Sequence, residues 1–366
     1  MSTTLLLLCI AYLIHLLIIT VLGFKIIRHQ DKGGGKSIET KISVIIAARN
    51  EEKNLGVLIE SIASQSTLPY ELIIVNDRSA DSTSSILETY CAQFSWLKVI
   101  TIHELPEGWT GKKHTLYQAV KHATGTFLVF TDADCLPCSN EWIETLNRSI
   151  EEGFDVILGY SPYTLEKGFL NQFIQWETLM TGLQYLGMAI IGKPYMGVGR
   201  NLAIRKDKYD LELLASIKHL EGGDDDLMIS NISSKENTKV ILSLKSQTNS
   251  STKTQLRNYL KQKTRHLAAG KYYHQKDQTL LGIFTLSWMV SWGLLVYLIT
   301  LSADLDIILM VFGIRSLFFY SIIHLVGQKL HTDIKIWALP FLDLCYCLYY
   351  PLVAIKALAT NKVEWK

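Results

Sequence analysis

The stretch FLVFTDADCLPCSN, residues 127–140, decides which fold the sequence predicts. Its first five residues, Phe127 to Thr131, are apolar or β-favouring, which is typical of a buried strand. Asp132 and Asp134 follow with one residue between them, so their side chains point the same way if the strand continues. Two such carboxylates suit a divalent metal that also binds phosphate, because Mg²⁺ is usually held by one or two carboxylates and phosphate oxygens. An isolated D-x-D pair is more often a solvated turn.

Strands and helices alternate before this stretch. We expect strands over 42–47, 71–76 and 97–102, and helices over 52–65, 82–94 and 113–122. This order is typical of a mostly parallel sheet covered by helices, in which ligands bind beyond the carboxyl ends of the strands. Those ends carry three polar clusters, Arg49-Asn50-Glu51, Asp77-Arg78-Ser79 and Asp132-Ala133-Asp134. Their convergence on one edge favours a ligand site over a solvated turn.

Hydrophobic residues make up 48% of the 366-residue chain and are concentrated in four long runs. Each run is long enough to cross a bilayer: residues 5–27, 280–301, 307–326 and 336–358. The first run is too long for a signal peptide and no small-residue cleavage site follows it, so we expect a retained anchor. The sequence therefore predicts a multi-pass protein of the cell membrane, inner or plasma.

Charge indicates the orientation of the chain and its partners. Lys25, Arg28 and His29 follow the first run, so the positive-inside rule places the next domain in the cytosol. The net charge is +2, and no basic stripe with interleaved aromatic residues occurs. We therefore expect a membrane partner and no nucleic acid.

Three motifs resemble those that open family 2 inverting glycosyltransferases: IIAARNEE at 45–52, VNDRSADST at 75–83 and TDAD at 131–134. GWTGK at 108–112 makes the chain similar to membrane members, the carotenoid- and hopanoid-associated glycosyltransferases. The resemblance covers roughly residues 41–273. It implies an α/β GT-A fold with a mostly parallel sheet, flanked by N-terminal and C-terminal transmembrane helices. It also implies a nucleotide-diphosphate sugar donor, with a UDP-sugar expected.

The apolar runs and the resemblance together predict five parts of the chain. They are an anchor over 1–30, a linker over 31–40, the GT-A domain over 41–250, an interfacial amphipathic region over 251–277, and C-terminal transmembrane helices over 278–366. The interfacial region contains QKTRH at 262–266, which resembles the family's QxxRW with His266 in place of tryptophan.

The same resemblance implies roles for individual residues. Asp134, with Asp132, would hold Mg²⁺ or Mn²⁺ against the donor diphosphate. The residues implied in donor binding are Ala48, Arg49, Glu51, Asp77, Lys112, Asp132, Gln262 and Arg265. GVGRNLA at 197–203 resembles the family's glycine-rich segment beside the donor sugar.

A second acidic cluster, EGGDDDL at 221–227, supplies the candidate catalytic base. Adjacent aspartates repel one another, so at least one should have a raised pKa, which suits a general base. The cluster resembles the family's ED-x-x-L motif, whose aspartate deprotonates the acceptor hydroxyl. Alignment on Leu227 gives Asp224 as the base, whereas alignment on the acidic pair gives Asp225. We favour Asp224.

Two further helices are expected near the membrane. Aromatic and apolar residues recur at helical spacing over 169–183, which predicts a helix that packs on the sheet or lies in the membrane interface. Residues 255–273 form a basic amphipathic stretch, which predicts an interfacial helix with lysines facing anionic headgroups.

The expected function is transfer of a sugar, with inversion, to a hydroxyl of a lipid or lipid-linked acceptor. A processive polysaccharide synthase would share the motifs, but it usually keeps QxxRW and has more spans. A membrane protein that binds nucleotide sugar without turnover is the remaining alternative, although both acidic clusters are intact.

The last two apolar runs contain ionisable residues that are costly in a bilayer. Arg315 falls near the middle of the third run and Asp343 about a third of the way into the fourth. If these runs form antiparallel helices, Arg315 and Asp343 come close enough to pair. A re-entrant last segment, broken at Pro340 and Pro351, would instead return the lysine-containing tail to the cytosol.

Overall fold

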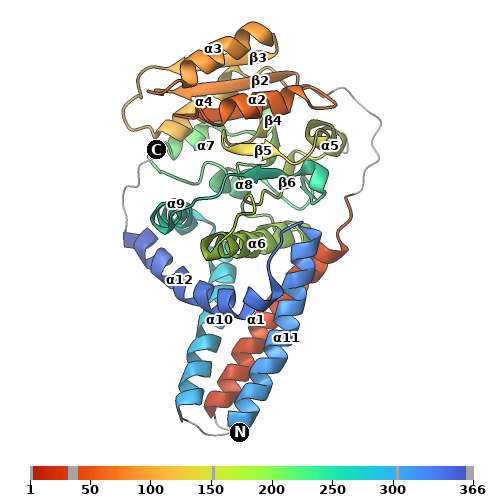
Figure 1. The fold of residues 1–366 in the computed structure, drawn as a ribbon, viewed down its shortest axis with the longest axis vertical. Helices are drawn as coiled ribbons and strands as arrows, with labels where there is room; N and C mark the ends of the chain where they lie inside the picture. The colour runs from red at the N-terminus through yellow and green to blue at the C-terminus, as the bar shows by residue number, and fades with distance from the viewer. Residues whose placement is uncertain (1–2, 32–39, 151–152, 302–304, 360–366) are drawn as a thin grey trace.

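The computed structural model describes residues 3–31, 40–150, 153–301 and 305–359. An α/β domain rests on a bundle of long apolar helices (Figure 1). The predicted linker lies almost entirely outside the described residues.

The domain is built on a seven-stranded sheet with the strand order β3-β2-β1-β4-β7-β6-β8. These strands are β1 (Ile42–Ala48), β2 (Glu71–Asp77), β3 (Leu97–Ile102), β4 (Phe127–Phe130), β6 (Val156–Gly159), β7 (Leu202–Arg205) and β8 (Thr238–Ile241). All pairs are parallel except those that β7 makes with β4 and β6. A separate antiparallel pair joins β5 (Cys135–Pro137) to β9 (Thr248–Ser250). The predicted mostly parallel α/β sheet is confirmed.

Alternate residues of the central strand β1 face two different cores, as the pleat of a strand requires. Val44 and Ile46 pack in a core with α2 (Leu55–Ala63), α3 (Thr83–Gln93) and α5 (Trp142–Ile150). Ile45 packs in a second core with α4 (Gly111–His122) and α6 (Phe169–Ile190). This second core continues into the apolar bundle, so the domain and the bundle share one hydrophobic interior.

The remaining helices of the domain lie around the second half of the sheet. They are α7 (Leu211–Ser216), α8 (Asp226–Ile232), α9 (Leu256–Ala268) and the short 3-10 helices η1 (Lys206–Lys208), η2 (Leu244–Ser246) and η3 (Ala269–Tyr272). The predicted helix over 169–183 is α6, which contacts both β8 and α1 (Thr3–Arg28). Its Trp176 is fully buried and packs edge-on against Phe319 of the bundle. Packing on the sheet and packing on the apolar helices are therefore both realised.

Four helices are long and apolar enough to cross a membrane, in agreement with the four predicted runs. They span Thr3–Arg28, Gln275–Leu301, Leu305–Lys329 and Ile336–Ala357. The first three, α1, α10 and α11, run side by side, and α1 contacts α10 and α11 along its length (Figure 1). The fourth comprises η4 (Ile336–Ala338) and α12 (Leu339–Ala359).

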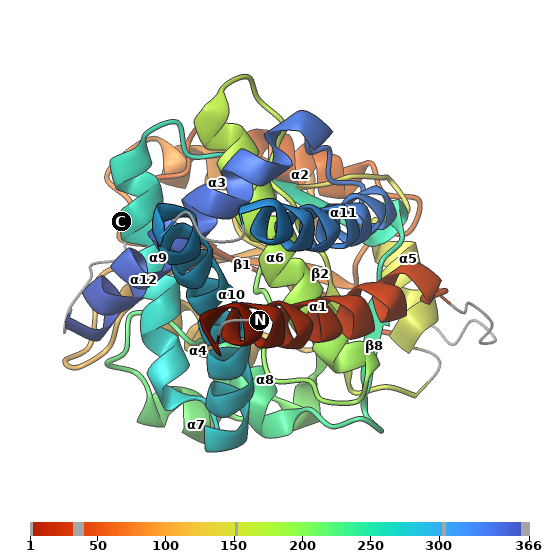
Figure 2. The same cartoon turned by 90° about the horizontal axis from the view of Figure 1, so that it is seen from below.

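The helix α12 does not run alongside α11 as an antiparallel partner. It crosses the bundle obliquely and packs mainly against α9 and α6 (Figures 1 and 2). One face, including Tyr346 and Val353, is buried, whereas Leu348 and Leu352 on the opposite face are exposed. The helix continues through Pro351, so the break considered at that residue does not occur.

The predicted contact between Arg315 and Asp343 is confirmed. Arg315 Nη1 donates a hydrogen bond to Asp343 Oδ2 at 2.5 Å, although the helices that carry them are not antiparallel neighbours along their length. The contact forms because α12 begins beside α11 before it turns away toward α9.

Candidate active site

The loops that follow β1 and β2 hold each other in place. Asn50 donates its backbone N–H to Ser79 Oγ at 2.9 Å, and its side-chain Oδ1 accepts from the backbone N–H of Ala80 at 2.8 Å. The backbone N–H of Glu51 donates to Thr83 Oγ1 at 2.9 Å. Asn50 has φ 56°, a left-handed conformation that asparagine tolerates better than most residues. The carboxyl edge of the sheet is therefore pre-formed around two of the predicted polar clusters.

Asp77 is fully buried at the end of β2, and both of its carboxylate oxygens are occupied. Arg78 Nε donates to Oδ1 at 2.7 Å and Arg78 Nη2 donates to Oδ2 at 2.9 Å. Such bidentate pairs fix a guanidinium firmly. A nucleotide that contacted Asp77 would therefore meet Arg78 as well, a residue to which the motif comparison gave no role.

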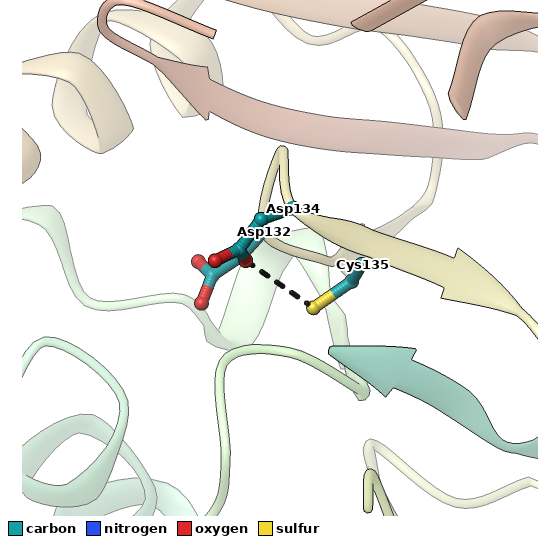
Figure 3. A group of neighbouring side chains, drawn as sticks. All are labelled: Asp132, Asp134 and Cys135. Atoms are coloured by element: carbon teal, nitrogen blue, oxygen red, sulfur yellow. Dashed lines mark hydrogen bonds between the residues drawn. The ribbon is translucent and has the colours of Figure 1, made fainter. Parts of the chain in front are cut away.

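The first acidic cluster lies at the end of β4 and the start of β5. One ligand atom from each of Asp132, Asp134 and Cys135 lies within 4.8 Å of the others (Figure 3). The Cys135 thiol is a weak donor to Asp134 Oδ1 at 3.8 Å, and burial raises its pKa well above the ordinary value. Two carboxylates fit Mg²⁺ or Mn²⁺, which prefer oxygen ligands, whereas a protonated thiol does not.

Lysines occupy the space beside both carboxylates. Lys112 Nζ lies 3.3 Å from Asp132 Oδ1, and Lys253 Nζ lies 3.7 Å from Asp134 Oδ2. Each aspartate therefore already has a lysine as counter-charge, and a divalent metal between the carboxylates would take the place of these lysine contacts. Lys253 carried no signal in the sequence, because it lies in an irregular segment far along the chain.

Lys112 joins the two acidic clusters. Its Nζ also lies 3.2 Å from Asp224 Oδ2. Burial alone would lower the pKa of Lys112, but the carboxylates of Asp132, Asp224 and Asp225 together raise it well above the ordinary value. Burial alone would raise the pKa of Asp224, but Lys112 and Lys113 hold it below the usual range. Asp224 is therefore an ionised partner of Lys112.

Asp225 connects the acidic cluster to the glycine-rich segment. It caps the N-terminus of α8, where its Oδ1 accepts from the backbone N–H of Asp226 at 2.9 Å. Its Oδ2 accepts from the backbone N–H of Gly199 at 2.6 Å. Burial and the neighbouring charge of Asp224 nevertheless raise the pKa of Asp225. The expected raised pKa within this cluster is confirmed.

Asp226 is buried and bonds to a residue outside the acidic loop. Its Oδ2 accepts a hydrogen bond from Tyr273 Oη at 2.7 Å, just before the start of α10. Burial and the charge of Asp225 raise the pKa of Asp226 well above the ordinary value. Asp226 thus links the acidic loop to the first helix of the C-terminal bundle.

Two further basic residues of the site were not singled out from the sequence. Lys113 Nζ donates to the carbonyl oxygens of Leu220 and Gly222, at 2.5 and 2.6 Å, and so fixes the loop that leads into the acidic cluster. The Arg200 guanidinium lies 4.4 Å above the ring of Tyr163. Arg200 lies inside the glycine-rich segment GVGRNLA, but the resemblance gave it no role of its own, and Lys113 follows directly after GWTGK.

A cavity of about 570 Å³ begins at the acidic cluster and continues to the apolar helices. Four of the predicted site residues line it: Lys112, Asp224, Asp225 and Arg265. His266, which replaces the family's tryptophan, lines it as well. Farther from the acidic cluster its walls come from α6, α10 and α12, including Tyr185, Gly282, Thr285, Tyr350 and Ala354.

The other predicted site residues lie outside this cavity. Ala48 ends β1, and Arg49 and Glu51 lie in the loop that follows it. Asp132 lines a smaller pocket together with Lys112 and Asp224. Among the described residues, Gln262 Oε1 and Arg49 Nε are buried without a hydrogen-bond partner. The predicted residues thus form two groups, one at the sheet edge near β1 and β2 and one at the cavity near the acidic clusters. Lys112 lines both the cavity and the smaller pocket.

Comparison with known proteins identifies the domain. Residues 43–210 match the family described as glycosyl transferase family 2, so this part of the chain is a glycosyltransferase family 2 domain. The chain is similar to the 4,4'-diaponeurosporenoate glycosyltransferase of Staphylococcus aureus (strain USA300), with 36% identity over 157 residues. That match covers 42% of this chain and 40% of the relative, so the chain spans less than half the length of that curated relative.

A solved structure shows the same fold over nearly the whole chain. It is the mannosyltransferase PcManGT from Pyrobaculum calidifontis, solved in complex with GDP-Man and Mn2+. The TM-score is 0.54 at 15% sequence identity, over 97% of this chain and 98% of that one. The GT-A fold expected from the motifs is therefore confirmed.

Proposed function

We propose that the chain is a membrane-bound glycosyltransferase that moves a sugar from a nucleotide-diphosphate sugar to a hydroxyl of a lipid-like acceptor, with inversion. One observation carries the proposal: a single cavity joins the acidic cluster at Asp224 and Asp225 to the apolar helices α10 and α12. A water-soluble acceptor would need no such connection. The name of the relative, a diaponeurosporenoate glycosyltransferase, supports an acceptor of the carotenoid class.

The donor diphosphate belongs at the first acidic cluster. Asp132 and Asp134 would hold Mg²⁺ or Mn²⁺ there, and the metal would neutralise the charge that develops on the leaving diphosphate. Lys112 lies between Asp132 and Asp224 and is placed to add a second positive charge. Arg265 lines the cavity on the opposite side. The nucleoside would lie toward the edge formed by Ala48, Arg49, Glu51 and Asp77, with Gln262 covering it from α9.

The catalytic base is Asp224 or Asp225, and the electrostatics favour Asp225. Asp224 is held ionised by Lys112, which makes it a weak proton acceptor. The raised pKa of Asp225 makes it a better one, because a general base works best with a pKa near the operating pH. A carboxylate has about four lone-pair positions, so the two backbone N–H groups on Asp225 leave room for a hydroxyl.

The orientation in the membrane follows from α1. Lys25 and Arg28 occupy its last turn, at the end nearer the domain, which favours a cytosolic domain by the positive-inside rule (Figure 1). A cytosolic domain would also have access to nucleotide sugars.

Release of nucleoside diphosphate tests the proposal. The purified full chain would be incubated with a membrane lipid extract as the source of acceptor hydroxyls, a panel of UDP- and GDP-sugars, and Mg²⁺ or Mn²⁺. We expect release from one donor, and its loss in Asp134→Asn. Asp207→Asn serves as the control, because Asp207 is an exposed surface aspartate paired with Arg205. A wild-type rate in Asp134→Asn at saturating metal would rule out the metal site, and donor binding without release from any donor would rule out the enzyme.

A further inference from the structure

The helices α10 and α12 touch along two turns and separate toward the domain. Trp288 Nε1 of α10 donates to Asp343 Oδ1 of α12 at 2.7 Å. The ring of Trp288 stacks on Tyr346 of α12 with 4.9 Å between centroids. Beyond this point α12 turns toward α9 while α10 continues toward Tyr273 and the acidic loop (Figures 1 and 2). The Thr285 side chain of α10 is also hydrogen-bonded to Tyr350 of α12, one turn nearer the domain. The two helices therefore form a wedge that is closed from Trp288 to Thr285 and open toward the domain beyond it.

The open part of the wedge is a wall of the cavity that contains Asp224 and Asp225. The open part is lined by Gly282 and Leu286 of α10 and by Ala354 and Ala357 of α12. Thr285, Tyr346 and Tyr350 line the cavity at the closed end. A Cβ placed on Gly282 would have no heavy atom of the described residues within 4 Å, apart from its own helix and neighbours. The small residues leave space between the helices for an apolar chain.

The cavity also reaches the outer surface of the bundle. Leu286 lines it and is 60% exposed on the surface that a membrane would cover. Its neighbour Ile283, one turn back on α10, is 45% exposed. A cavity of about 570 Å³ lies within the range of roughly 300–1,000 Å³ that holds ligands in other proteins. The lining of the cavity therefore extends from Leu286, on the outer surface of α10, to the carboxylates of Asp224 and Asp225.

We propose that the gap between α10 and α12 is a lateral entrance for the acceptor, a lipid with a hydroxyl head and a single linear apolar chain. The hydroxyl passes between Gly282 and Ala354 to reach Asp225, and the chain stays between the two helices. The closed end at Trp288 and Asp343 keeps the chain in the half of the membrane next to the domain. This inference rests on the proposed function, because it names how the acceptor of that reaction reaches the site.

Photolabelling tests the entrance without requiring sugar transfer. The full chain would be reconstituted in phosphatidylcholine and phosphatidylglycerol vesicles containing hexadecanol with a diazirine at its chain end. We expect labelled peptides from α10 and α12 in the wild type. Gly282→Trp should reduce that labelling by about tenfold or more, because the indole fills the gap and a loss of about 1.4 kcal/mol of binding corresponds to tenfold.

Matched controls separate blockage from misfolding. Gly293 lies on the same helix, also has no described heavy atom within 4 Å of an added Cβ, and does not line the cavity. Gly293→Trp should label like the wild type. On α12, Ala354→Trp should block labelling and Leu352→Trp, at a 69% exposed position, should not.

The outcomes distinguish the entrance from the reaction. Equal labelling of Gly282→Trp and Gly293→Trp would overturn the entrance, as would wild-type labelling confined to α1 and α11. Labelling in the expected pattern supports the entrance even if no sugar is transferred from any donor. That combination of results would contradict the proposed function and not the entrance.

Discussion

Arg315 on α11 and Asp343 on α12 form an ion pair within the apolar helices, with Nη1 and Oδ2 2.5 Å apart. Their side chains are 2% and 0% exposed. Asp343 also accepts hydrogen bonds from Trp288 Nε1 at 2.7 Å and from Tyr320 Oη at 3.1 Å. One carboxylate thus ties α12 to both α10 and α11, at the point where α12 departs toward the domain.

Removing either member of the pair should destabilise the bundle. Arg315→Leu or Asp343→Leu leaves a buried charge without its partner, which costs about 3–5 kcal/mol in comparable pairs. The double variant removes both charges and should recover much of that loss. Thermal unfolding in detergent measures the effect. A double variant no more stable than the worse single variant would mean that the two residues are not partners.

The course of α12 predicts the side on which the chain ends. Ala359 closes α12 near α9, whereas the α11 end at Leu305 lies with the N-terminal part of α1, at the far end of the bundle (Figure 1). We expect Ala359→Cys to react with an impermeant maleimide from the same side as Glu88→Cys in the domain. Leu305→Cys should react from the other side. The six native cysteines must first be replaced. Labelling of Ala359→Cys together with Leu305→Cys would show that α12 crosses the membrane.

Lys113 should act by positioning the acidic loop. Lys113→Met removes the two hydrogen bonds to Leu220 and Gly222, so the loop shifts relative to the donor. We expect a loss in kcat of about a hundredfold, the effect of a displacement of about 1 Å in other enzymes, with donor affinity retained. Lys121→Met, an exposed change on the same helix, is the control. An unchanged kcat in Lys113→Met would contradict the positioning role.

The pH profile should identify the base. A carboxyl group must be ionised to accept a proton, so the rate falls as the pH drops through its pKa. The pKa of Asp225 is raised above the ordinary aspartate value of 3.8, so the acid limb of kcat should lie above that value. The pKa of Asp224 is lowered, so Asp224 as base would place the limb below 3.8. Asp225→Asn should lose about 10²–10⁴-fold in kcat. A wild-type kcat in that variant would show that Asp225 is not the base and would favour Asp224.

Local patterns in the sequence were sufficient for much of the fold. The strand over 97–102 was predicted at the bounds that β3 has. The helix expected from residue 52 begins only at Leu55, because Asn54 Nδ2 donates to Glu51 Oε2 and fixes a turn first. The antiparallel strand β7 could not be placed between β4 and β6 from its own residues, because strand order depends on pairings distant in sequence.

The same limit applies to the site and to the membrane helices. Asp132, Asp134, Asp224 and Asp225 stood out because acidic residues cluster along the chain. Contacts such as those of Lys113 appear only once the loops are folded together. Hydropathy predicted the length of the last apolar segment but not its direction. The hydropathy of a segment does not show which face of the helix packs on α9. The Arg315–Asp343 pair was predictable because an unpaired charge in an apolar segment is costly.

The most direct test of the proposed function is the mass of the lipid product. Lipids would be extracted from cells that express equal amounts of the wild-type chain or Asp225→Asn, and then compared by mass spectrometry. The account predicts a lipid in the wild type that is heavier than its precursor by one sugar residue and is absent with Asp225→Asn. Identical lipid profiles from the two, or a sugar polymer in place of a singly glycosylated lipid, would contradict it.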